Sequence, residues 1–188
     1  PGIDHMSAMQ VIDHIRDNGG KMILFESFTG GLVAPESDTN LWNYKFTWNP
    51  RNVVLAGQGG AAEFIQEGSY KYIPYQRLFR RTEFLEIEGH GRFEGYANRN
   101  SLKYRSVYGL DDIATLYRGT IRRVGFSKAW HIFVMMGMTD DSYKIQETEE
   151  MSYRDFINLF LPYSPKDSVE LKLRHYLKID QDDLLWDK

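Results

Sequence analysis

Hydrophobic periodicity changes once along the chain, near residue 124, and this change limits the fold more than any other feature of the sequence. Before it, short aromatic and β-branched runs alternate with polar residues, which is typical of strands. After it, the segments repeat their apolar residues at helical spacing. The expected strands are residues 21–28, 43–48, 70–76, 84–87, 92–97 and 114–126. The pattern predicts an α/β layer over residues 1–124 and a small all-helical domain over residues 125–188.

Helix signals interrupt the predicted strands at three places. Asp4 is a suitable N-cap for a helix that Gly19-Gly20 would end. A second helix is expected over residues 51–68, because Asn49-Pro50 is a common helix start. Ser101 is expected to open a further helical segment.

Both ends of the sequence look truncated. Residues 1–3 resemble the tail of a turn, and the final "DDLLWDK" ends in a helix-like segment whose apolar side chains need a partner. We therefore expect the chain to be a piece of a longer protein.

The composition excludes several classes of protein. A chain of 188 residues with 42% hydrophobic residues can bury one sizeable core. Its net charge of -3 creates no field that gathers nucleic acid or an anionic membrane. The absence of cysteine excludes disulfides and thiolate nucleophiles. We expect a soluble protein in a reducing, cytoplasmic environment, with no nucleic-acid or membrane partner.

Familiar catalytic motifs are missing. The histidines show no metal-ligand spacing, so no metal site is expected. Gly30-Gly31 can bring the backbone close to a ligand, but the G-x-G-x-x-G spacing of a dinucleotide fold is absent. Asp4 and His5 stand at a helix start, where they form either a capping pair or a site for a cofactor phosphate.

The arginines are more informative. In "YRGTIRR", strand alternation puts Arg118, Thr120 and Arg122 on one face, which is either solvated or a floor that binds carboxylates through paired hydrogen bonds. Arg99 lies at a strand-to-helix junction, a common place for ligand-binding side chains. Lys45 supplies another cation or is an ordinary surface lysine.

Several segments together resemble a known family. "PGIDHMSAMQVID", "SFTGGLVAPES", "YKFTWNP", "GYANRNSLKY" and "YRGTIRRVGFSKA" occur in this order over residues 1 to about 137. They are similar to the C-terminal, substrate-binding region of the glutamate-forming saccharopine dehydrogenases. The resemblance implies an α+β fold, with a mixed β-sheet, flanking helices and a small helical domain.

The resemblance also implies site residues. Arg99, Thr120, Ile121 and Arg122 would bind saccharopine, a secondary amine with three carboxylates, and Ile121 would contribute backbone groups. Thr29 and Gly30 would line the same site, and Pro1 and Gly2 would contact the cofactor. The family commonly has tyrosine and cysteine at the positions of Phe28 and Thr29, so any acid/base role there is in doubt. Asp4 and His5 remain the nearest titratable candidates for proton transfer.

The implied reaction is hydride transfer between saccharopine and NAD or NADP, followed by hydrolysis to glutamate and aminoadipate semialdehyde. An upstream Rossmann domain would bind the cofactor, so the chain alone is expected to have no dehydrogenase activity. A homodimer is expected from the aromatic side chains at Tyr70, Tyr72, Tyr75 and Phe79. Two alternatives stay open: a dehydrogenase for another carboxylated amine, such as carboxynorspermidine, and a non-catalytic binding or dimerisation module.

Overall fold

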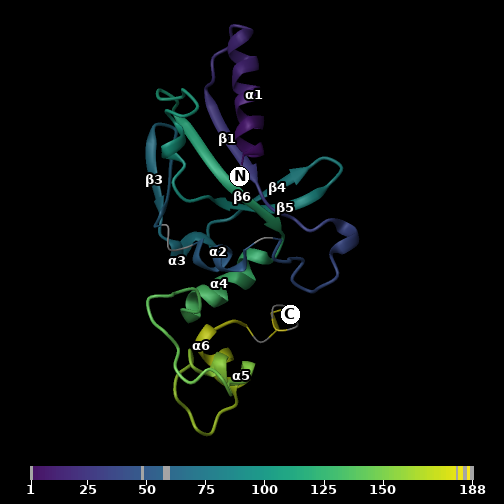
Figure 1. Cartoon of the computed structure of the whole chain (residues 1–188), viewed down its shortest axis with the longest axis vertical. Coiled ribbons are helices and arrows are strands. Elements are labelled where there is room, and N and C mark those ends of the chain that lie inside the picture. The colour runs from purple at the N-terminus through teal and green to yellow at the C-terminus, as the bar shows by residue number, and fades with distance from the viewer. Residues whose placement is uncertain (1, 48, 57–59, 181, 184–185, 187–188) are drawn as a thin grey trace.

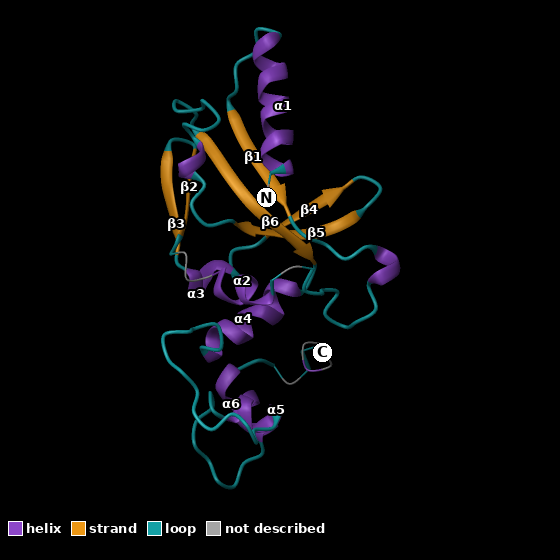
Figure 2. Cartoon of the chain, viewed as in Figure 1, coloured by secondary structure: helices purple, strands orange, loops and turns teal. Residues whose placement is uncertain are grey.

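The computed structural model describes residues 2–47, 49–56, 60–180, 182–183 and 186 of the chain. Its helices are α1 (Ile3–Asp17), α2 (Pro50–Val54), α3 (Tyr75–Leu78), α4 (Phe126–Met136), α5 (Tyr153–Asn158) and α6 (Val169–Leu177). Its strands are β1 (Leu24–Thr29), β2 (Ala62–Gln66), β3 (Ser69–Ile73), β4 (Glu83–Ile87), β5 (Gly91–Ala97) and β6 (Thr115–Arg123). Short 3₁₀ helices lie at Pro35–Ser37 and Leu102–Tyr104. Figure 2 shows the strands gathered in one part of the molecule, with α5 and α6 at the far end.

Strand β6 is the centre of the sheet. Along one edge it pairs in parallel with β1, from Leu24↔Thr115 to Thr29↔Thr120. Its other edge is shared, because β2 pairs with Leu116 and β5 pairs antiparallel with Gly119–Arg123. The order β3-β2-β6-β5-β4, with β1 also on β6, confirms the expected mixed sheet with flanking helices.

One face of the sheet is covered by α1. Ile12 of α1 packs with Phe25, Tyr108 and Leu116 in a buried cluster. At its N-terminal end, α1 lies over β6, where Asp4 accepts a hydrogen bond from Arg118 at 3.0 Å (Figure 1). The Arg118 guanidinium also lies 4.0 Å from the centre of the Tyr104 ring. An apolar contact and an ion pair therefore fix the helix at two points.

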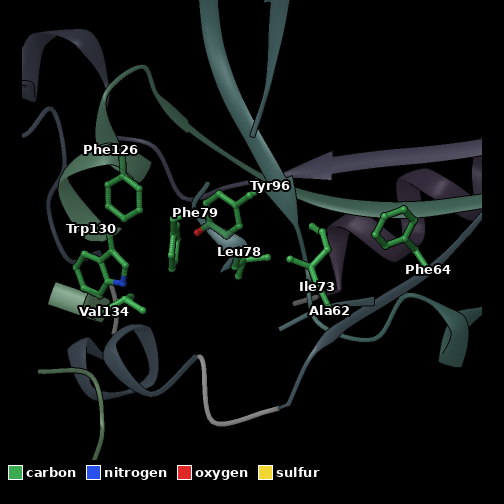
Figure 3. Packing of buried hydrophobic residues seen from close by; sticks show 10 residues of the cluster. Ala62, Phe64, Ile73, Leu78, Phe79, Tyr96, Phe126, Trp130 and Val134 are labelled. Carbon is green, nitrogen blue, oxygen red and sulfur yellow. The ribbon is translucent and has the colours of Figure 1, made fainter. Parts of the chain in front are cut away.

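A second cluster packs α3 and α4 against the sheet. Figure 3 shows Phe126, Trp130 and Val134 of α4 facing Phe79 and Tyr96. The Phe79 ring meets the Tyr96 ring edge-on at 4.9 Å, and the Phe126 and Trp130 rings stack at 5.5 Å. This packing sets the position of α4 at the end of β6.

The C-terminal helices form a third cluster around Met136, Leu161 and Leu177. Helix α4 belongs to two clusters. Its earlier turns pack on the sheet, and Met136 packs with α5 and α6. The helical character of this part of the chain agrees with the sequence, and the division into two domains near residue 124 stays a prediction.

Four local expectations were wrong. Residues 43–47 form no strand, and Trp48 lies outside the described residues. Of the helix expected over residues 51–68, the described residues form only α2, and the alternating run at Ala62–Gln66 is strand β2. Ser101 opens only a short 3₁₀ helix. Gly2, and not Asp4, is the N-cap of α1, since the Asp4 carboxylate is bound to Arg118.

We predict that Leu116→Ala lowers the free energy of unfolding by about 2–5 kcal/mol, since Leu116 is 0% exposed on the central strand. The control is Ile23→Ala, because Ile23 is 79% exposed just before β1. Urea denaturation of both variants checks this, and equal losses in the two would contradict the role given to β6.

We also predict a pH-dependent effect of Asp4→Asn. Burial raises the pKa of Asp4, but the nearby His5 and Arg118 charges and backbone N–H groups outweigh it and hold the pKa below its ordinary 3.8. The carboxylate therefore stabilises the fold above about pH 4 and loses this effect as the pH falls through the lowered pKa. Near pH 7 the variant should be less stable by about 1.5–3 kcal/mol, and this difference should shrink below pH 4.

The matched control for Asp4 is Asp13→Asn, since the Asp13 carboxylate meets Arg16 at 3.7 Å in solvent. Thermal unfolding at pH 3 and pH 7 should show little effect of this control. A stability loss in Asp4→Asn that stays constant between the two pH values would argue against the Asp4–Arg118 ion pair.

Candidate functional site

The ends of β1 and β6 bring five predicted residues together. Thr29 lies directly beside Thr120 in the parallel register. At Gly30 an added Cβ would lie 2.3 Å from the carbonyl oxygen of Ile121 and 3.2 Å from Nη1 of Arg122. Only glycine fits this contact, because the nearest obstacle is backbone that cannot move aside. The glycine therefore lets the loop after β1 lie directly against the end of β6.

The guanidinium of Arg122 lies beside a pair of contacting aromatic rings, whose centres are 4.8 Å apart. Its Cζ lies 5.4 Å from the centre of the Tyr44 ring and 5.3 Å from that of Phe126. Nη1 donates a hydrogen bond to the Ile121 carbonyl at 3.0 Å, whereas the buried Nε has no hydrogen-bond partner. Sequence reasoning missed Tyr44, because it lies in the segment expected to be a strand.

The neighbouring arginines of β6 already have carboxylate partners. Arg118 is 8% exposed and paired with Asp4, and Arg123 lies 3.9 Å from Asp38. Arg122 has no acidic partner within ion-pair distance in the described part of the chain. The expected floor of two arginines is therefore reduced to Arg122, since Arg118 is covered by α1.

Two tyrosine hydroxyls lie near this charge. Burial raises the pKa of Tyr44, although Arg122 opposes the change. Burial likewise raises the pKa of Tyr96 to about 12, again with Arg122 opposing it. Both hydroxyls therefore stay protonated at neutral pH, where they can donate hydrogen bonds and do not act as bases.

Arg99 lies on the other edge of β6, beyond the end of β5. Its backbone has a φ of 43°, in the left-handed region that is uncommon for a residue with a side chain. The carbonyl of Arg99 accepts a hydrogen bond from Glu63 N at 2.8 Å, and Asn100 donates to the Glu63 carboxylate at 2.5 Å. These contacts fix the turn and leave the Arg99 side chain exposed. Within the described residues, its guanidinium has no ion pair and does not contact Arg122.

Asp4 and His5 belong to a hydrogen-bonded cluster at the start of α1. Nδ1 of His5 lies 2.6 Å from the Tyr108 hydroxyl, and its ring stacks on Tyr104 at 4.9 Å. Burial raises the pKa of Tyr108, with the Arg118 charge opposing it. Both candidate acid/base residues therefore interact with other side chains of the chain: Asp4 with Arg118, and His5 with Tyr108. Their role in proton transfer stays a prediction.

The other residues singled out from the sequence have separate surroundings. Gly2 is exposed at the start of α1, and Pro1 lies outside the described residues, so cofactor contact at these positions stays a prediction. The Phe28 ring covers Gly119, where an added Cβ would lie 2.4 Å from it, so the side chain has a packing role. Nζ of Lys45 donates to the Ser37 carbonyl at 2.6 Å and to Thr39 at 3.1 Å, which ties the lysine to the loop after β1.

The described residues offer neither a metal site nor a membrane-spanning helix. They contain no group of three or more histidine and carboxylate side chains placed to hold a metal ion. They also contain no helix with the length and hydropathy needed to cross a membrane.

Comparison with known proteins identifies the family. Residues 1–183 match the family model described as the saccharopine dehydrogenase C-terminal domain. The NADP(+)-linked, L-glutamate-forming saccharopine dehydrogenase of Schizosaccharomyces pombe is 37% identical over 142 residues, which cover 76% of this chain and 31% of the relative. The mitochondrial α-aminoadipic semialdehyde synthase of Rattus norvegicus is 36% identical over 138 residues, 73% of this chain and 15% of the relative.

A solved structure agrees with these matches. The apo, histidine-tagged, L-Glu-forming saccharopine dehydrogenase of Saccharomyces cerevisiae superimposes with a TM-score of 0.81 at 28% identity. The alignment covers all of this chain and 42% of that one, so this chain spans less than half the length of the relatives that it matches. The chain belongs to the saccharopine dehydrogenase C-terminal domain family.

Proposed function

We propose that this chain is the substrate-binding region of an oxidoreductase that interconverts saccharopine with glutamate and aminoadipate semialdehyde. The family and the names of the relatives from Schizosaccharomyces pombe and Rattus norvegicus support the assignment to lysine metabolism. The geometry at the end of β6 supports binding of a substrate that carries carboxylates.

One observation carries the proposal. Arg122 is the β6 arginine whose charge has no acidic partner in the described residues, and its Nε is buried without a hydrogen bond. A partly buried cation without a counter-ion is costly to maintain unless a ligand supplies the negative charge. A substrate carboxylate fits this need, since a planar guanidinium binds it through two parallel hydrogen bonds.

The other residues take roles that follow from their positions. Thr29 and Thr120 are partners in the register of β1 and β6, and we propose that their hydroxyls donate to or accept from the substrate. Gly30 allows close approach of the backbone at Ile121. Arg99 is exposed and unpaired on the opposite edge of β6, and we propose that it binds a second carboxylate of the same substrate.

The hydride chemistry is that of NAD or NADP when bound, because protein side chains do not transfer hydride. The relatives from Schizosaccharomyces pombe and Saccharomyces cerevisiae support a nicotinamide cofactor, and the first is named for NADP(+). Gly2 is exposed at the start of α1, and we propose that a cofactor approaches the chain there. The residues of this chain would position the substrate carbon and exclude competing reactions.

Assembly and location are further proposals. We propose a homodimer that uses the exposed rings of Tyr70 and Tyr72 on β3, which are 54% and 58% exposed. Phe79 is unsuitable for this role, because it is buried in the core. A cytoplasmic location stays a prediction from the sequence.

We predict that Arg99→Lys and Arg122→Lys each weaken saccharopine binding by roughly 1.5–3 kcal/mol, because lysine keeps the charge but loses the two-pronged geometry. The matched control is Arg123→Lys, since Arg123 is the next residue of β6 and already lies near Asp38. Isothermal titration of saccharopine into each variant, with melting temperatures measured in parallel, checks the prediction.

The control should bind saccharopine as the unchanged chain does. Unaltered affinity in both Arg99→Lys and Arg122→Lys would overturn the proposed carboxylate site. A fall in melting temperature without a change in affinity would instead assign these arginines to the fold.

A further inference from the structure

Glu94 is a buried carboxylate in the middle of β5. It is 5% exposed and lies directly opposite Arg122 in the register of β5 and β6. Despite this register, Glu94 forms no ion pair with any described residue. A buried carboxylate needs compensation from other groups, because an uncompensated one destabilises the fold strongly.

The start of α4 supplies that compensation. Oε2 of Glu94 accepts a hydrogen bond from Gly125 N at 3.2 Å, and Oε1 accepts one from Ser127 N at 2.5 Å. Gly125 is the N-cap residue, and its φ of 99° is a conformation that only glycine adopts easily. The N–H groups at a helix start have no partner within the helix, and a carboxylate both binds them and meets the positive end of the helix dipole.

This contact controls what surrounds Arg122. Phe126 is the first residue of α4 and lies between the two N–H groups that Glu94 binds. Its ring is 5.3 Å from Cζ of Arg122 and 4.8 Å from the ring of Tyr44. Fixing the first turn of α4 therefore fixes one wall of the guanidinium site. The same hydrogen bonds hold the Glu94 carboxylate at the start of α4, so that Arg122 stays free for a ligand.

We infer that Glu94 is a positioning residue, which acts through the first turn of α4 to orient Arg122 and to leave its charge available for a substrate carboxylate. The inference rests on the proposed function, in which Arg122 binds saccharopine. It assigns to Glu94 an effect on substrate affinity without contact with the substrate.

Glu94→Ala and Glu94→Gln test this assignment. Alanine removes both acceptor oxygens, whereas glutamine keeps the size of the side chain and one acceptor, because its amide nitrogen only donates. The matched control is Val134→Ala, which loosens the packing of α4 away from its start. The readouts are the Nε–Hε NMR signal of Arg122, assigned by its loss in Arg122→Lys, and the affinity for saccharopine.

In Glu94→Ala we expect the Arg122 signal to shift or broaden and the affinity to fall about tenfold, the loss that matches one charged hydrogen bond. Glu94→Gln should give intermediate changes, with loss of amide protection at Gly125 or Ser127. Val134→Ala should lower the melting temperature and leave the Arg122 signal in place. If Glu94→Ala does not fold, Glu94→Gln decides the question by the same signals.

An unchanged Arg122 signal in the folded Glu94 variants would overturn the inference, as would an equal change in Val134→Ala. The NMR signal needs no ligand, so it separates this inference from the proposed function. If the unchanged chain does not bind saccharopine, the proposed function fails, and the Arg122 signal still decides whether Glu94 positions the guanidinium.

Discussion

The rest of the structure depends on the pairing of β6, because this strand hydrogen-bonds with β1 on one edge and with β2 and β5 on the other. A strand held on both edges gives its side chains fixed directions. Leu116 faces the core beneath α1, Arg118 meets Asp4, and Arg122 extends toward α4. The proposed site is therefore a property of the most constrained strand in the molecule, and loops only complete it.

Charge pairing then distinguishes a structural arginine, Arg118, from the arginine proposed to bind a ligand, Arg122. Arg118 and Arg122 share a face by strand alternation, yet their neighbours differ. The first is buried under α1 with a carboxylate partner, and the second lies beside two aromatic rings with none among the described residues. A protein that binds a substrate with several carboxylates needs an arginine that its own acids leave unpaired. Glu94, the carboxylate opposite Arg122 in the sheet register, is hydrogen-bonded to the start of α4 and forms no ion pair with Arg122.

The sequence predicted those parts of the fold that depend on local periodicity. It identified β1, β3, β4, β5, β6 and the C-terminal helices, and its motifs indicated Arg122 and Gly30. It did not predict contacts between distant segments, because periodicity carries no information on what lies opposite a side chain. Asp4 and Arg118 are 114 positions apart, so their ion pair was not visible. Tyr44 was missed because its aromatic segment alternates like a strand but forms a loop beside Arg122.

The most direct test of the account is a crystal structure of this chain with saccharopine bound. We predict a substrate carboxylate within hydrogen-bond distance of an Nη of Arg122, beside Thr120 and the backbone at Gly30 and Ile121. Substrate bound elsewhere, with Arg122 still unpaired beside Tyr44 and Phe126, would contradict the proposed carboxylate site.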